Sequence, residues 1–217
     1  MRQSKRTLIL EAGSRVVQRD GVTALTYESV AQEAGVTKGG LLYHFPSRKA
    51  LLLALHEHVA GQWEAAMEAD AGGPAAEVDA DSRFRAYARL HETPARAELL
   101  LMLEASEHEA ADAIWQAVHN RWAPPVPQAR RDESGAEAQS GQGQSGEEQP
   151  GEEQSGEAPG AGSAAGHDAG SEYDAEAVRA FLARLAADGL WLYEALDSEG
   201  LDPALHDRLL REMTRMA

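Results

Sequence analysis

Residues 127–177 contain no Val, Ile, Leu, Met, Phe or Trp, and Tyr173 is the only large apolar side chain among them. Ordering a residue costs about 1–2 kcal/mol of backbone entropy, and this stretch has almost no apolar surface whose burial could offset that cost. We therefore expect residues 128–172 to form a disordered, acidic, low-complexity loop. It is either a plain solvated loop or an acidic segment that docks on a basic part of the chain. The folded core has to come from the residues on both sides of it.

On both sides of this loop the apolar residues recur at intervals of three and four, which is the period of an α-helix. Leu8, Ala12, Val16 and Val17 mark one face of a first helix that ends near Gly21. Strand-like alternation of useful length is absent from the sequence, so the predicted fold class is all-α. A long helix is expected from Ser47 to Gly72, and later helices are expected at about 82–92, 94–108, 110–123, 175–196 and 203–216.

The charge is divided unevenly along the chain. The formal net charge is −16, yet residues 1–60 hold eight Lys and Arg against five Asp and Glu, so this part carries +3. A basic end on an acidic protein is typical of a nucleic-acid-facing domain.

The composition also excludes several classes of protein. Without Cys the chain has no disulfides, no thiolate nucleophile and no Cys-ligated metal. Its apolar runs, such as residues 51–55 and 99–103, are far shorter than the about 20 residues that span a bilayer. Residues 1–6 are polar and basic and do not resemble a signal peptide. We expect a cytoplasmic protein with no membrane partner.

Residues 26–45 have the pattern of a helix–turn–helix. Thr26 is placed to cap a short helix, Gly35 to supply the turn, and Thr37 to cap a second helix. Gly39 and Gly40 stand in the first turn of that second helix, where two glycines cost roughly 1–2 kcal/mol of helix propensity. That cost is explained if the backbone has to approach another molecule closely, as in a DNA major groove.

A set of residues around this motif resembles the TetR/AcrR family of bacterial transcriptional regulators. The resemblance covers about residues 5–55, with Gly40 and Arg48 as mild departures from the family pattern. It rests on Thr26, Val30-Ala31, Ala34-Gly35-Val36-Thr37, Gly39, Leu42-Tyr43-His44-Phe45 and Ser47-Arg48-Lys49-Ala50-Leu51.

The resemblance implies an N-terminal three-helix helix–turn–helix DNA-binding domain, residues 1–46, and a C-terminal helical ligand-binding and dimerisation domain, residues 47–217. It further implies a homodimeric repressor that leaves a pseudo-palindromic double-stranded DNA operator when an unidentified small-molecule effector binds. The DNA-binding residues carried over from the family are Thr26, Thr37, Lys38, Gly39, Leu42, Tyr43, His44 and Lys49. Phe45 and Val30 are expected to hold the small domain together.

In relatives the last two helices pair with the same helices of a second copy. Here residues 175–217 supply two apolar helix faces, which could make that contact or could face the core of their own chain. The apolar residues are Val178, Phe181, Leu182, Leu185, Leu190, Leu192, Leu196, Leu205, Leu209, Leu210, Met213 and Met216. A ligand pocket would be lined by large aromatic residues and Met, although the same residues could simply fill a core. The candidates are Trp63, Met67, Phe84, Tyr87, Met102, Ile114, Trp115, Trp122, Trp191 and Tyr193.

The histidines do not form a convincing metal site in the sequence. His56 and His58 point in different directions on a helix, and the set Glu104, His108 and Asp112 is interpreted as a solvated polar face. We expect no metal, no cofactor and no enzymatic activity, because no catalytic motif is present. The competing hypothesis is a helix–turn–helix architectural or adaptor protein whose C-terminal part binds another protein.

Overall fold

The computed structural model describes residues 4–90, 96–129, 173–196 and 201–216. In these ranges every regular element is helical, which confirms the all-α prediction. Most of the expected loop, residues 130–172, lies outside the described part, as do residues 91–95. No helix in the described ranges is long and apolar enough to cross a membrane. The elements are α1 (Lys5–Asp20), the short 3₁₀ helix η1 (Val22–Ala24), α2 (Tyr27–Ala34), α3 (Lys38–His44), α4 (Arg48–Ala71), α5 (Ala80–Leu90), α6 (Arg96–Ala105), α7 (Glu109–Trp122), α8 (Ala175–Leu196) and α9 (Pro203–Met216).

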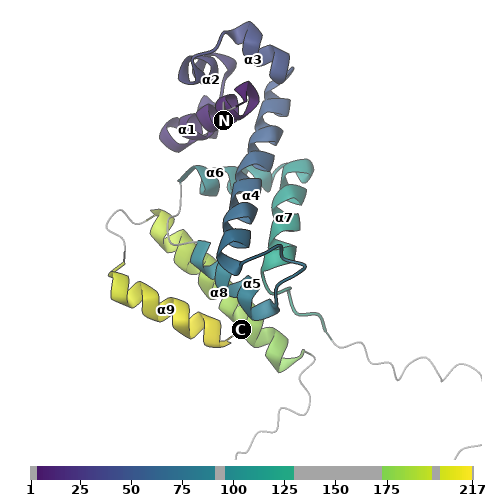
Figure 1. Ribbon diagram of the computed structural model, residues 1–217, viewed down its shortest axis with the longest axis vertical. Coiled ribbons are helices and arrows are strands. Elements are labelled where there is room, and N and C mark those ends of the chain that lie inside the picture. Colours follow the sequence, from purple (N-terminus) through teal and green to yellow (C-terminus); the bar gives the residue numbers. More distant parts are fainter. Residues whose placement is uncertain (1–3, 91–95, 130–172, 197–200, 217) are drawn as a thin grey trace, which may run out of the picture.

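Helices α1 to α3 gather around the N-terminal end of α4, and α5 to α9 lie along the rest of its length (Figure 1). We call residues 4–45 the head and the part formed by α5 to α9 the body. The two parts share α4, which enters both.

Side-chain caps fix the helix starts in the head. Ser4, Thr26, Thr37 and Ser47 each accept a hydrogen bond from the backbone N–H three residues further on, at 3.0–3.1 Å. Gly35 ends α2 in the left-handed region at φ +64°, where a residue with a Cβ is strained. The predicted caps at Thr26 and Thr37, the predicted start of a helix at Ser47 and the predicted turn at Gly35 are therefore confirmed.

The core of the head is apolar and closed. Val30 and Phe45 are buried, as expected. Leu8, which was expected to mark the buried face of the first helix, is only partly buried, and the neighbouring Ile9 and Leu10 fill that place instead. On the rim, Glu33 of α2 accepts hydrogen bonds from two arginines of α1 and so fixes the angle between these helices.

Adjacent residues of α4 belong to different parts of the molecule. Leu55 packs into the head, where its methyl groups lie 3.6 Å from the place that a Cβ on Gly13 would occupy. His56, the next residue, faces the body. A second connection comes from α6, where Arg96 donates to the Gln18 carbonyl at 3.0 Å and the Ala97 N–H donates to the Gln18 side chain at 2.7 Å.

The body is built around aromatic side chains. Trp63 of α4 makes edge-to-face contacts with Trp115 of α7 and Trp191 of α8, with ring centroids 5.3 and 5.9 Å apart. Buried Tyr87 of α5 donates its hydroxyl to Asp188 of α8 at 2.5 Å. These contacts join four helices, and edge-to-face rings contribute beyond their buried area.

A buried histidine corrects the expectation of a solvated polar face. His56 is fully buried; its Nε2 lies 2.8 Å from Glu104 Oε2, and its Nδ1 accepts a hydrogen bond from the Trp115 indole N–H at 3.1 Å. His108 Nε2 lies 3.4 Å from the other oxygen of Glu104. The Glu104 side chain is therefore a partner of His56 and not a solvated group. Since Nδ1 accepts, the neutral tautomer of His56 carries its proton on Nε2 and donates it to Glu104.

This arrangement predicts a pH-dependent stability. Burial lowers the pKa of His56 below its usual 6.5, although Glu104 opposes the shift. The unfolded chain then binds a proton more readily than the folded chain, so the stability is complete above about pH 6.5 and falls as the pH drops below that value. We expect the free energy of unfolding in urea to decrease from pH 7.5 to 5.5, by up to about 1.4 kcal/mol per pH unit for each such histidine.

The replacement His56→Gln should reduce this pH slope, because it removes one titrating group. Burial also lowers the pKa values of His58 and His119, so part of the slope should remain. A slope in His56→Gln equal to that of the unmodified protein would contradict this assignment.

Candidate nucleic-acid interface

Helix α3 turns one side outward and buries the other. Leu41 and Phe45 are buried beneath it, whereas Tyr43 is 85% exposed and Leu42 is 39% exposed. Tyr43 has no role in the core that would explain an aromatic ring at this position. A protruding tyrosine next to exposed polar groups suits contact with another macromolecule.

The first turn of α3 is also open. Thr37, Lys38, Gly39 and Gly40 are all exposed. A Cβ on Gly39 would meet no atom within 4 Å, so nothing inside the protein requires glycine there. A Cβ on Gly40 would lie 3.2 Å from Thr37 Oγ1, which is the capping oxygen. The contact with Thr37 therefore explains in part why residue 40 is glycine. No contact within the described part of the protein explains glycine at position 39, and a molecule that approaches α3 closely would explain it.

The two threonines among the predicted DNA contacts are also the predicted helix caps, and their capping bonds limit what they can offer to DNA. Thr26 caps α2 and donates its own hydroxyl to Ser29 Oγ at 3.0 Å. Thr37 accepts from the Gly40 N–H at 3.1 Å, and its hydroxyl hydrogen is still able to donate to an acceptor such as a phosphate oxygen.

The predicted cationic and imidazole residues lie on the same end of the molecule. Lys38 forms an ion pair with Glu28 of α2, so DNA would have to compete with this carboxylate for the lysine. Lys49 is exposed in the first turn of α4. His44 is half-buried, and its ring meets the Tyr43 ring edge-on with centroids 5.2 Å apart. The structure thus brings all eight predicted residues to the helix–turn–helix and the start of α4.

The sequence did not predict the contacts that two residues, Arg48 and Glu28, make at this surface. Arg48 donates from Nε to the Leu25 carbonyl at 2.9 Å and from Nη2 to the Val22 carbonyl at 3.0 Å. It therefore ties α4 to the segment that precedes α2. Glu28 holds Lys38 from ten residues away, and no local pattern in the sequence signals that pair.

Most of the predicted pocket residues are buried in the body and pack against one another. Met102 and Ile114 are only partly buried, and Tyr193 is 51% exposed. The buried members are Trp63, Met67, Phe84, Tyr87, Trp115, Trp122 and Trp191. A ligand at this place would have to separate side chains that are in contact here.

Two family models match the chain, one in the head and one toward the C-terminus. The model described as bacterial regulatory proteins of the tetR family matches residues 9–55, and the tetracyclin repressor-like C-terminal domain matches residues 164–217. The first match contains α2 and α3, where the exposed glycine and tyrosine lie.

Curated relatives match over the same N-terminal region. The HTH-type transcriptional regulator TtgR of Pseudomonas putida is 35% identical over 75 residues, which are 31% of this chain and 36% of the relative. The HTH-type transcriptional regulator RutR of Escherichia coli K12 is 35% identical over 66 residues, which are 30% of this chain and 31% of the relative. The matches therefore span about a third of the length of these relatives.

Solved structures share the whole fold at low identity. The multidrug binding protein EbrR, complexed with malachite green, is 19% identical with a TM-score of 0.55, and the match covers 99% of this chain and 98% of EbrR. A TetR family member from Streptomyces coelicolor A3 is 18% identical with a TM-score of 0.53 over 99% and 98% of the two chains. Because a tetR-family model matches its N-terminal part and a tetracyclin repressor-like model matches its C-terminal part, the chain is identified as a member of the TetR family of bacterial regulatory proteins.

Proposed function

We propose that this protein is a homodimeric transcriptional repressor that binds a pseudo-palindromic DNA operator through α3 and leaves it when a small molecule binds the body. The observation that carries the DNA assignment is the exposed face of α3, with a protruding Tyr43 and a glycine at position 39 that the fold does not need. Phosphate contacts are assigned to Thr37, Tyr43, His44 and Lys49, and contacts near base edges to Lys38, Gly39 and Leu42. Thr26, whose hydroxyl and backbone N–H both donate to Ser29 Oγ, is assigned to holding the start of α2 beside the DNA.

The dimer is supported by apolar side chains that α8 and α9 leave uncovered. On α8 the exposed leucines at 182, 185, 192 and 196 follow a helical spacing. Gly189 lies between them and is also exposed, and a Cβ added to it would meet no atom within 4 Å. A glycine in such a row lets another helix approach closely. Phe181, Leu190, Leu210 and Met213 are partly or fully buried against this chain, so the proposed interface consists of Val178, Leu182, Leu185, Leu192, Leu196, Leu205, Leu209 and Met216.

The ligand is assigned to the aromatic cluster around Trp63, Trp115 and Trp191, between α4, α7 and α8. Aromatic side chains commonly line ligand cavities, and EbrR, which shares this fold, has been solved with malachite green bound. A molecule that separates these rings would displace α4. Since α4 also carries the head, the two α3 helices of a dimer would change their separation and no longer fit successive grooves.

A second candidate function is favoured by a specific observation. The aromatic residues of the body are packed against one another, and the apolar face of α8 and α9 is open. These features also fit a DNA-binding adaptor whose body binds a different protein. The two functions differ in whether a small molecule weakens DNA binding.

The role of Gly39 can be tested by a substitution that should raise the stability of the fold and lower its affinity for DNA. Gly39→Ala should raise the free energy of unfolding by about 0.5–1 kcal/mol, because alanine is the better helix former and its Cβ meets nothing in the protein. The same change should weaken binding to a duplex selected from a random pool by about tenfold or more, since a methyl group would stand where DNA approaches. Chemical unfolding and fluorescence anisotropy measure the two effects.

Gly61→Ala is the matched control, because Gly61 is exposed in α4 and its Cβ would also meet nothing within 4 Å. It should give a similar gain in stability with unchanged DNA binding. If Gly39→Ala left DNA affinity unchanged, α3 would not be the contact surface.

The Glu28–Lys38 pair predicts a substitution that improves DNA binding. Glu28→Gln frees Lys38 and removes a negative charge beside the proposed phosphate contacts, so affinity should rise about 2–10-fold. Glu77→Gln removes the same charge from an exposed position beyond the far end of α4 and should have little effect. Equal effects of the two changes, measured by anisotropy at one salt concentration, would show that only net charge matters.

The dimer interface is tested with Leu185→Glu. A charge in the middle of the α8 stripe should convert the dimer to a monomer while the helix content stays the same, because Leu185 is 49% exposed in the single chain. Light scattering and circular dichroism measure these quantities. Leu103→Glu, at a leucine of α6 that is 60% exposed, is the control and should remain dimeric. A dimeric Leu185→Glu variant would move the interface elsewhere.

Release by a ligand is tested by thermodynamic linkage, with malachite green as the probe. If the probe favours the DNA-free conformation, bound DNA must weaken probe binding by the same factor by which the probe weakens DNA binding. Quenching of tryptophan fluorescence with and without the selected duplex measures this factor. Equal probe affinities in both titrations, with DNA shown to be bound, would favour the adaptor function.

A further inference from the structure

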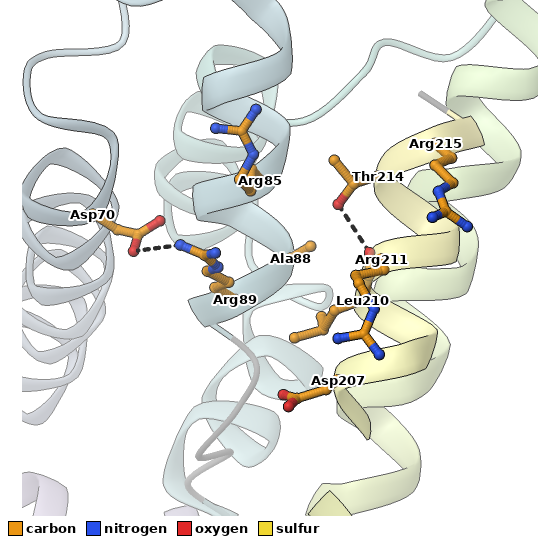
Figure 2. A pocket seen from close by; sticks show the side chains of 9 residues that line it. All are labelled: Asp70, Arg85, Ala88, Arg89, Asp207, Leu210, Arg211, Thr214 and Arg215. Carbon is orange, nitrogen blue, oxygen red and sulfur yellow. Dashed lines mark hydrogen bonds and ion pairs between the residues drawn. The ribbon is translucent and has the colours of Figure 1, made fainter. Parts of the chain in front are cut away.

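A surface cavity of about 730 Å³ lies between α5 and α9 at the C-terminal end of α4 (Figure 2). Figure 2 shows Arg85 and Arg89 projecting from α5 and Arg211 and Arg215 from α9. The full lining is Asp70, Arg85, Ala88, Arg89, Asp207, Leu210, Arg211, Thr214 and Arg215. Four cations and two carboxylates therefore surround one concave surface on a chain whose net charge is −16.

The lining of this cavity carries an excess of positive charge, with four arginines against Asp70 and Asp207. The two arginines on α5 are four residues apart, and so are the two on α9, which places like charges one helical turn from each other on both walls. The walls also face each other across the cavity. An anion between them would remove this repulsion.

Only part of this positive charge is neutralised within the described residues. Arg89 donates to Asp70 of α4 at 3.3 Å, and Arg215 donates to Glu212 of its own helix at 2.9 Å. Arg85 and Arg211 make no hydrogen bond or ion pair within the ranges that the structure describes, although Arg85 is near enough to Asp79 to contribute, after the hydrogen bonds from Ser82, to the lowered pKa of that carboxyl. Guanidinium groups bind carboxylates and phosphates through two parallel N–H donors, so these two arginines are suited to acidic groups of a ligand.

The size and position of the cavity restrict what it can bind. A volume of about 730 Å³ is in the range of organic ligands and much larger than a single inorganic ion needs. Ala88 and Leu210 add an apolar part to the lining. The lining residue Asp70 lies near the C-terminal end of α4, whereas α3 lies at the N-terminal end of α4 (Figure 1). The cavity is therefore not a continuation of the proposed DNA surface.

We infer that this cavity binds a small organic anion with two or more carboxylate or phosphate groups, which Arg85 and Arg211 hold from opposite walls. This site is separate from the aromatic cluster and does not depend on the proposed repressor function. A ligand group that reaches Arg89 competes with Asp70 for the same guanidinium and so loosens the contact between α5 and the end of α4.

Calorimetric titration of the full chain tests this inference, with citrate as the carboxylate probe and pyrophosphate as the phosphate probe, in about 150 mM NaCl to screen non-specific attraction. We expect saturable binding of at least one probe with one site per chain. The double variant Arg85→Gln/Arg211→Gln should weaken that binding at least about tenfold, with helix content unchanged by circular dichroism.

The matched control is Arg179→Gln/Arg208→Gln, which removes the same charge from exposed positions of α8 and α9 outside the cavity. It should change probe affinity less than about twofold. Binding of citrate alone or of pyrophosphate alone would support the site and identify the preferred acidic group. Absence of saturable binding of both probes, or an equal loss in the control variant, would overturn the inference.

Discussion

Helix α4 holds the molecule together, because its residues complete the core of the head and the core of the body at once. Leu55 fills the head against Gly13, while His56 is bonded to Glu104 of α6 and Trp115 of α7. Further along, Glu64 binds Arg121 of α7 at 2.6 and 2.7 Å. A helix held on both sides can shift only if both parts respond, so a change in the body necessarily reaches the head.

The contacts that fix α4 differ in chemical character along its length. In the head they are largely apolar, together with the hydrogen bonds of Arg48 to the Val22 and Leu25 carbonyls and the ion pair between Arg6 and Glu57 at 4.0 Å. In the body they are aromatic and polar, and the buried His56 is neutral as long as the Trp115 indole donates to its Nδ1. Polar pairs of this kind have one good geometry, whereas apolar contacts tolerate small displacements.

Local signals in the sequence predicted most of the helix ends. Thr26, Thr37 and Ser47 cap the helices that follow them, and Gly35 adopts the left-handed turn, because each of these effects acts within three or four residues. Contacts between distant residues were not predictable in this way. His56 meets Glu104 across 48 positions, and the sequence pattern alone suggested a solvated face for that glutamate. The sequence also left open whether Trp63, Trp115 and Trp191 line a pocket or fill a core. The answer depends on how α4, α7 and α8 pack together, and no single segment of the sequence determines that packing.

In the proposed complex, two copies of α3 enter successive major grooves of one operator. This geometry is tested by methylation interference and hydroxyl-radical footprinting of the full chain on duplexes that it selects from a random pool. We expect interference at guanine N7 in two inverted half-sites whose centres are about one helical turn apart, or a multiple of it. A single unpaired half-site, or protection without any major-groove interference, would contradict it.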